Sequence, residues 1–187
     1  MGAITTTMDL QFDHRGPDGD IGPVTVSFDA EDIREARRIA ARKVDSVSRA
    51  SPGGAPRARE VRLSRLVAGK LADHAVKRLL TRYMRKFAPG RSIEEYDEIR
   101  TDGFRDADPW DLRSAGDDGP PLLVEVRSSF VHHLSAPLEL WEHPKQSLLG
   151  PYATSSKVDV APKYLVWQLA FFHVPALDPH GGRDPPF

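Results

Sequence analysis

The sequence contains no cysteine, which excludes disulfide bonds and thiolate metal sites. It has no apolar run near the ~18 residues that a membrane-spanning helix needs. No basic segment followed by an apolar run opens the chain, as a secretory leader would require. Neither a Walker-type glycine loop for nucleotide hydrolysis nor a pair of histidines at the helical His-x₃-His spacing of zinc sites is present. We therefore expect a cytoplasmic protein with no membrane partner.

Charge is nearly balanced over the whole chain, at a formal net −1, but it is unevenly distributed. Residues 34–91 carry seventeen Lys and Arg against four acids, whereas residues 92–187 carry eight against sixteen. A basic middle followed by an acidic second half is typical of a protein that binds phosphates with one part and a divalent metal with another. The alternative is a pair of solvated helices with arginine-rich outer faces.

The length of 187 residues suits one compact domain with extensions. We expect an N-terminal extension over residues 1–60, an α/β core over residues 61–173 and a tail rich in Pro and Gly over residues 174–187. Within the extension, the alternation of residues 24–28 predicts a short strand. Asp29 begins a basic helix, with Asp32 completing a capping box, and Arg49–Ala58 has the composition of a flexible linker.

The core is predicted to begin with a long helix over residues 64–87, ended by Pro89 and Gly90. Its apolar face is expected to consist of residues at four-residue steps, namely Leu71, Ala75, Leu79, Tyr83 and Phe87. Alternating or β-branched segments predict strands at residues 95–100, 111–113, 122–127 and 163–172, with short helical turns at 138–141 and 146–149. The expected architecture is mixed α/β, a central four- or five-stranded sheet flanked by helices.

The most informative stretch lies between Asp111 and Arg127. On a strand, Glu125 and Arg127 share one face, and a turn over residues 116–121 brings Asp111 beside Glu125. Burial of charged side chains within an apolar strand costs free energy unless the charges are paired or serve a function. Two carboxylates and a guanidinium at one point suit Mg²⁺ and a phosphodiester. The alternative is a buried salt bridge in an ordinary hairpin, and Asp106 and Asp108 compete with Asp111 as the first ligand.

These residues resemble the PD-(D/E)xK, or restriction-endonuclease-like, nuclease superfamily, over the span from about Val67 to Phe172. Its signature is an Asp at the end of one strand, a hairpin, and then Glu/Asp-x-Lys on the next strand. Asp111 takes the place of the first acid, Glu125 that of the second, and Arg127 that of the lysine. An arginine can clamp a phosphate but is a poor proton acceptor. A general base would then have to come from elsewhere, with Lys145, Lys157 and Lys163 as candidates.

The resemblance implies a restriction-endonuclease-like core and cleavage of DNA by a metal-activated water, with Mg²⁺ or Mn²⁺ as the cofactor. It further implies that Asp111 and Glu125 hold the ion and that Arg127 stabilises charge on the phosphate. Superfamily members often carry a further acid on the helix before the sheet, and Asp73 occupies that position. A solvent-facing Asp73 is the alternative.

Several basic side chains of residues 34–91 are expected to track the DNA backbone without reading its sequence. The set is Arg37, Arg38, Arg42, Lys43, Lys70, Lys77 and Arg78. A competing hypothesis is a catalytically inactive nuclease-like module that binds nucleic acid or a protein partner in a larger complex or homo-oligomer. A third is a structural or assembly protein that does not retain DNA even at low salt.

Overall fold

The computed structural model describes residues 14–15, 20–21, 26, 28–47, 56–106, 108–116, 119–131 and 164–172. For residues 14–15, 20–21, 129–131 and 164–172 only the backbone is described. The helices in these ranges are α1 (Ala30–Lys43), α2 (Arg59–Phe87) and α3 (Tyr96–Ile99). The strands are β1 (His14–Arg15), β2 (Asp20–Ile21), β3 (Ser92–Glu95), β4 (Leu112–Ala115), β5 (Leu123–Val131) and β6 (Tyr164–Phe172).

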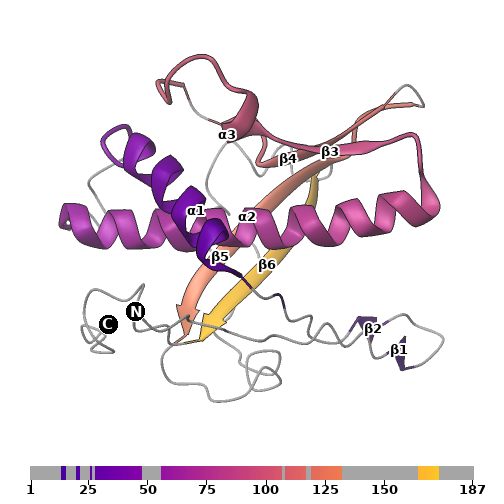
Figure 1. The fold of residues 1–187 in the computed structure, drawn as a ribbon, viewed down its shortest axis with the longest axis horizontal. Coiled ribbons are helices and arrows are strands. Elements are labelled where there is room, and N and C mark those ends of the chain that lie inside the picture. Colours follow the sequence, from indigo (N-terminus) through magenta and orange to yellow (C-terminus); the bar gives the residue numbers. More distant parts are fainter. Residues whose placement is uncertain are drawn as a thin grey trace.

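The main sheet has four strands in the order β3-β4-β5-β6 (Figure 1). Strands β3, β4 and β5 are antiparallel, whereas β6 runs parallel to β5 along its whole length. Strands β1 and β2 pair separately. The fold is therefore mixed α/β, as the sequence predicts.

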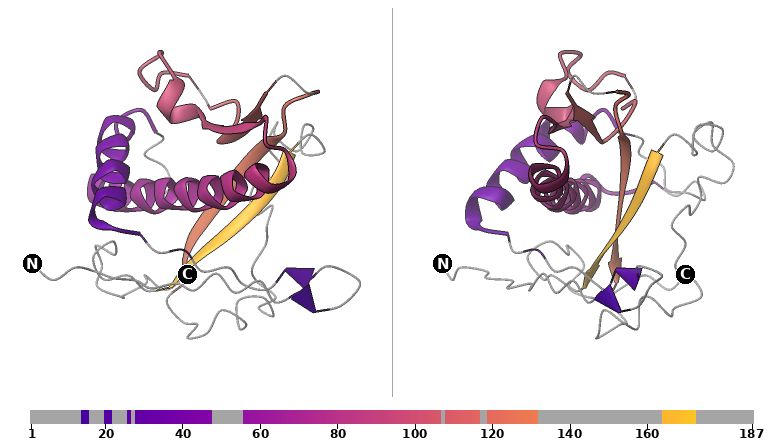
Figure 2. Two further views of the ribbon diagram at one scale, coloured as in Figure 1. Left: turned by 45° about the vertical axis from the view of Figure 1, so that its right-hand side comes forward. Right: turned by 90° about the vertical axis from the view of Figure 1, so that its right-hand side faces the viewer.

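Helix α2 lies between α1 and the main sheet, and both helices lie on the same side of that sheet (Figure 2). One apolar cluster joins α2 to the sheet, and its buried members are Ala72, Val76, Leu80, Ile93, Leu112, Val124 and Val126. A second cluster joins α1 to α2 through Ala36, Ala40, Val67 and Leu71. The middle of α2 is therefore enclosed on both sides, and a charged side chain there needs a partner.

The start of α1 confirms the capping box predicted from the sequence. The Asp29 carboxylate accepts a hydrogen bond from the Asp32 backbone N–H at 2.9 Å, and the Asp32 carboxylate accepts one from the Asp29 N–H at 3.0 Å. Of the strand expected at residues 24–28, Val26 and Phe28 are described, and neither belongs to a strand. The other residues of that segment lie outside the described ranges.

The strand predicted at residues 95–100 is wrong. Strand β3 ends at Glu95, and the chain turns into the single helical turn α3. The Tyr96 N–H donates to the Asp111 carbonyl at 3.0 Å, and Asp97 then turns inward to meet Lys43 and Lys70. These ion pairs hold the buried carboxylate of Asp97. A strand that continued beyond Glu95 would take Asp97 away from both lysines.

The remaining elements differ from expectation mainly at their ends. Strand β6 closely matches the predicted strand 163–172, and β4 and β5 each begin one residue later than predicted. Helix α2 begins five residues earlier than predicted. The turns expected at 138–141 and 146–149, the tail and most of the linker lie outside the described ranges. None of the helices described combines the length and apolar character needed to cross a membrane.

Candidate metal centre

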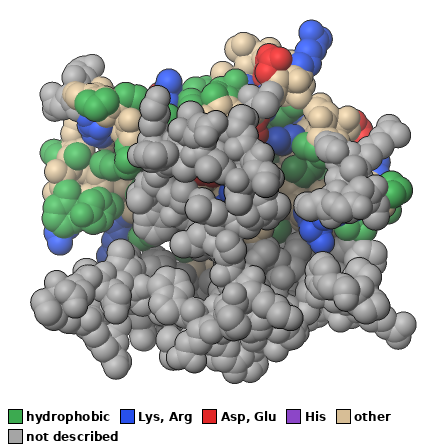
Figure 3. All heavy atoms as spheres, turned by 180° about the vertical axis from the view of Figure 1, so that it is seen from behind, with side chains coloured by type: hydrophobic (Ala, Val, Ile, Leu, Met, Phe, Trp, Pro, Cys, Tyr) green, Lys and Arg blue, Asp and Glu red, His purple; other side chains and the backbone are tan. Residues whose placement is uncertain are grey.

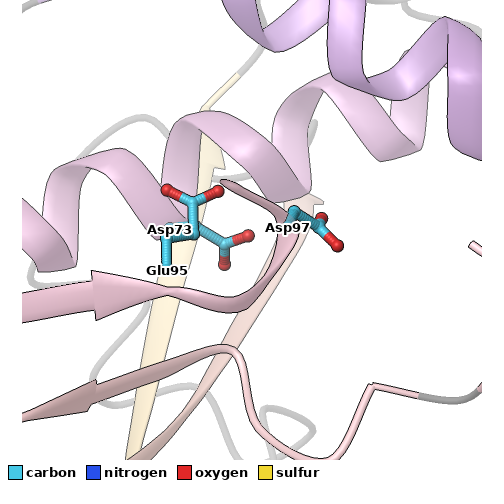
Figure 4. A group of neighbouring side chains, drawn as sticks. All are labelled: Asp73, Glu95 and Asp97. Carbon is cyan, nitrogen blue, oxygen red and sulfur yellow. The ribbon is translucent and has the colours of Figure 1, made fainter. Parts of the chain in front are cut away.

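Three buried carboxylates meet where α2 packs on the end of β3. Asp73 extends from the middle of α2, Glu95 is the last residue of β3, and Asp97 lies in α3 (Figure 4). One ligand oxygen of each lies within 4.8 Å of the others. Carboxylate oxygens are hard ligands that suit Mg²⁺, Mn²⁺ or Ca²⁺. We call Asp73, Glu95 and Asp97 the acidic triad, and it could hold a metal ion.

Lys70 lies one turn before Asp73 on the same face of α2. Its ammonium nitrogen is 2.5 Å from Asp73 Oδ2, 2.8 Å from Glu95 Oε1 and 2.5 Å from Asp97 Oδ2. Burial opposes the charge on Lys70, but the three carboxylates outweigh it and raise the pKa of Lys70 above its ordinary value. Lys70 is therefore the cation that the whole triad shares.

Asp97 has further positive partners. Lys43 Nζ approaches its carboxylate at 3.2 Å, and Arg100 Nη1 at 3.1 Å. Burial raises the pKa of Asp97, but Lys70 and Lys43 more than offset that effect and leave the pKa below its ordinary value. The Asp97 carboxylate is therefore charged and well compensated.

Asp73 and Glu95 are less well compensated. Burial, with repulsion from Asp111 and Glu95, raises the pKa of Asp73 well above its ordinary value despite Lys70. Glu95 is fully buried, and no described residue makes a hydrogen bond to its Oε2 atom. The imidazole Nε2 of His74 lies 3.6 Å from this oxygen. A buried carboxylate oxygen without a partner is costly, so this part of the triad has unused capacity to bind a cation.

Asp111 lies next to this group. Its Oδ2 accepts a hydrogen bond from the Val126 N–H at 2.6 Å, which fixes the carboxylate against β5. Its charge is one cause of the raised pKa of Asp73. The Asp111 N–H donates to the Val124 carbonyl at 3.3 Å, and Leu112 also pairs with Val124. Asp111 is therefore held against the strand that carries Glu125, but the strand pairs do not include the expected pairing of Asp111 with Glu125.

Glu125 and Arg127 pair with each other, at 2.7 Å between Oε1 and Nη2. Val124 and Val126 pack against α2, so the alternation of side chains sets Glu125 and Arg127 on the other face of β5. Among the described residues, the only three acids close enough to share one ion are those of the acidic triad. Of the predicted ligands Asp73, Asp111 and Glu125, the structure therefore includes only Asp73 in that group.

Most of the cations expected to bind DNA make contacts within the protein. Arg38 pairs with Glu35, Lys77 with Glu98 and Arg78 with Asp32. Lys43 and Lys70 belong to the buried network described above, and the guanidinium of Arg42 lies 5.2 Å from the Phe104 ring centroid. Arg37 is exposed. Any nucleic acid that contacts this surface would have to compete with these carboxylates.

Glu95 and Asp97 are the site residues that sequence reasoning missed, and Lys70, which was expected to contact DNA, instead pairs with the triad. One signal was available, because Glu95 and Asp97 flank a single residue directly after an alternating segment. In a strand, that spacing sets two acids on one face. Asp108 pairs with Lys43 and Arg100 rather than joining the triad. Lys145, Lys157 and Lys163 lie outside the described ranges.

No protein family, no curated protein and no solved structure matches this chain.

Proposed function

We propose that this protein is a divalent-metal-dependent nuclease of the restriction-endonuclease-like kind, acting on DNA in the cytoplasm. Asp73 and Glu95 would hold the ion, joined by Asp111 from the edge of the same site. The observation that carries the proposal is the fully buried Glu95, with one oxygen that accepts no hydrogen bond from any described residue, inside a group of acids that share a single lysine.

The chemistry of the donor atoms supports Mg²⁺ or Mn²⁺ as the ion. The donors are carboxylate oxygens, without the sulfur or imidazole ligands that favour softer metals. A divalent ion in such a site supplies a nucleophilic water at neutral pH and stabilises charge on a phosphate. The arrangement of a helix, an antiparallel β3-β4-β5 unit and a parallel β6 is compatible with the mixed, helix-flanked sheet that the resemblance implies.

The protein's own side chains would divide the remaining work. Lys70 balances the charge of the acids before an ion arrives, and the Val126 N–H holds the Asp111 carboxylate in a fixed orientation. Arg127 pairs with Glu125 on the other face of β5, away from α2 and the acidic triad, so this proposal assigns it no contact with a phosphate at the ion.

The proposal is tested by incubating the protein with circular single-stranded DNA and with supercoiled plasmid, in Mg²⁺, Mn²⁺ or EDTA. We expect cleavage with either ion and none in EDTA. Asp111→Asn should lower the rate by at least about tenfold, because loss even of an outer partner of a metal ligand costs that much. Asparagine keeps an oxygen for the Val126 N–H, so the fold should persist. Asp106→Asn, at an exposed aspartate in the preceding loop, should leave the rate unchanged.

A second variant, Glu95→Gln, removes charge but not volume from the triad, and it too should be inactive. Its matched control is Glu98→Gln, which changes a carboxylate that pairs with Lys77 at the surface. Retained cleavage in both Asp111→Asn and Glu95→Gln would refute this assignment of the site. Salt-sensitive DNA binding without cleavage by the unaltered protein would instead support the inactive nuclease-like module.

Metal binding should depend on pH through Asp73. Because the pKa of Asp73 is raised in the metal-free protein, an incoming ion has to displace its proton at pH values below that pKa. We therefore expect the affinity for Mn²⁺ to rise with pH, by up to about tenfold per unit, and to level off above that pKa. Calorimetric titrations in buffers of different ionisation enthalpy count the proton released. Asp73→Asn should weaken binding and abolish that proton release, and an unchanged proton count would contradict the assignment.

A further inference from the structure

The last turns of α2 present two aromatic side chains to solvent. Tyr83 is 57% exposed and Phe87 is 58% exposed, although the sequence predicts that both continue the buried face. Their ring centroids are 4.4 Å apart with the planes tilted by 39°. Among the large hydrophobic side chains described, only these two and Ile99 are exposed to this degree. Exposed aromatic rings that adjoin one another often mark a binding surface.

Basic residues adjoin these rings in the sequence. No acid occurs between Asp73 and Glu94, and Arg82, Arg85 and Lys86 are all exposed. Within the described part of the chain, none of the three has a carboxylate partner. The ammonium of Lys86 lies 4.9 Å from the Phe87 ring centroid. Seen from behind, hydrophobic and basic side chains adjoin at the left-hand edge of Figure 3, the side on which α2 ends.

The helix sets the two kinds of side chain in neighbouring strips. Tyr83 and Phe87 are four residues apart and therefore lie on one face, as do Arg82 and Lys86. With about 3.6 residues per turn, the aromatic strip lies between the core-facing Leu80 and the basic strip. We call Arg82, Tyr83, Lys86 and Phe87 the α2 end patch, whereas Arg85 is two residues from each ring and therefore lies on the far side of the helix. The cations of this patch differ from most of those expected to bind DNA, because no carboxylate in the described ranges pairs with them.

We propose that the α2 end patch binds single-stranded nucleic acid, with bases stacked on Tyr83 and Phe87 and phosphates beside Arg82 and Lys86. This inference rests on the proposed nuclease function, and it names single-stranded nucleic acid as the substrate class of that function. Stacking needs unpaired bases with open faces, whereas a duplex hides those faces and offers mainly its phosphates. The aromatic rings therefore favour a single strand, and the unpaired cations supply the complementary charge.

The patch lies within reach of the acidic triad. Asp73 and Tyr83 are ten residues apart on one unbroken helix, which corresponds to about 15 Å along its axis. One strand with ~3.4 Å between phosphates crosses that distance in about five nucleotides, and an extended strand crosses it in fewer. A strand bound at the patch can thus have a phosphate near Asp73 and Glu95.

The test measures binding without cleavage. A fluorescent oligothymidylate of about 16 nucleotides is titrated with the protein in EDTA and low salt, and its anisotropy is followed. We expect Tyr83→Ala and Phe87→Ala each to weaken binding by about fivefold or more, since one stacked base is worth that much. Tyr83→Phe should bind as the unaltered protein does, because the ring is kept. Ile99→Ala, at the third exposed hydrophobic residue, should also bind normally.

Two further measurements separate stacking from charge. The Tyr83→Ala and Phe87→Ala variants should bind a duplex of the same length as tightly as the unaltered protein. Replacing Arg82 and Lys86 together by glutamine should reduce the slope of log affinity against log salt by about 1.4, from a loss of ~0.7 per phosphate contact. An oligouridylate arm shows whether the sugar is also recognised.

Because EDTA removes divalent ions from the binding assay, these measurements do not depend on the nuclease activity. If the protein binds the oligonucleotide but never cleaves DNA, the proposed nuclease function is refuted and the proposed binding patch is supported. If Tyr83→Ala and Phe87→Ala cleave DNA normally and bind oligothymidylate with unchanged affinity, the nuclease function is supported and the binding patch is refuted. Failure of the unaltered protein to bind the oligonucleotide would also overturn the patch. So would a change from dimer to monomer in either alanine variant, measured by light scattering, because the rings would then form an interface between copies.

Discussion

Lys70→Met is expected to lower the free energy of unfolding by about 3–5 kcal/mol in EDTA, because it leaves the acidic triad without its shared cation. Methionine matches the apolar stem of lysine, so the loss comes from charge rather than volume. Lys77→Met is a matched control on the same helix. Lys77 pairs with Glu98 at the surface, where such a pair contributes about 0–1 kcal/mol. Urea denaturation of both variants measures the difference.

The same variant also tests whether the triad binds metal. Without the ammonium of Lys70, a divalent ion has no internal competitor for Asp73 and Glu95. We expect Mg²⁺ or Ca²⁺ to raise the melting temperature of Lys70→Met by more than that of the unaltered protein, since a ligand that binds only the folded state stabilises it. If the acids form only an ion-pair network, the two proteins will respond alike. If Lys70→Met proves as stable as Lys77→Met, the triad is not held by this lysine.

Arg100→Ala is expected to have a comparable effect, also about 3–5 kcal/mol, because Arg100 joins several acids in one buried network. Its guanidinium makes two contacts with Asp102, at 2.6 and 2.7 Å, and also pairs with Asp97 and Asp108. It lies 4.5 Å from the Phe104 ring centroid. These partners hold the loop after α3, in which Phe104 has a φ of 67°, a conformation that a bulky side chain rarely adopts.

Arg100→Lys separates charge from shape. Lysine keeps the charge but not the planar fork that meets Asp102 at two points, so it should recover only part of the lost stability. Arg105→Ala removes an exposed arginine from the same loop and should change stability by about 0.5 kcal/mol or less. Thermal and urea unfolding measure all three variants. Equal stability of Arg100→Lys and the unaltered protein would show that the fork geometry is unimportant.

Local features of the fold could be predicted from the sequence where one short-range cause dominates. The Asp29 capping box needs only two residues three apart, and β6 needs only its β-branched and aromatic content. The segment after Glu95 could not be predicted in this way, because alternation alone favours a strand there. The turn into α3 depends on ion pairs with Lys43 and Lys70, which are far away in the sequence.

The candidate site was predictable only in part for the same reason. Asp73, Asp111 and Glu125 could be named because each has a characteristic position relative to a helix or strand, but only Asp73 belongs to the acidic triad. The grouping of Asp73 with Glu95 and Asp97 depends on how α2 lies across β3, which periodicity does not specify. The exposure of Tyr83 and Phe87 likewise depends on where tertiary contacts to α2 stop, because their spacing alone predicts a continuing buried face.

The continuity of α2 has a consequence for any strand bound along it. Between Asp73 and Phe87 the helix has no break, so it acts as a rigid spacer of about 21 Å. Two sites on such a spacer keep a fixed separation, whatever the surrounding loops do. If the end of the helix grips a strand and the acids cut it, the number of nucleotides from grip to cut is constant, and the protein would measure a length without reading a sequence.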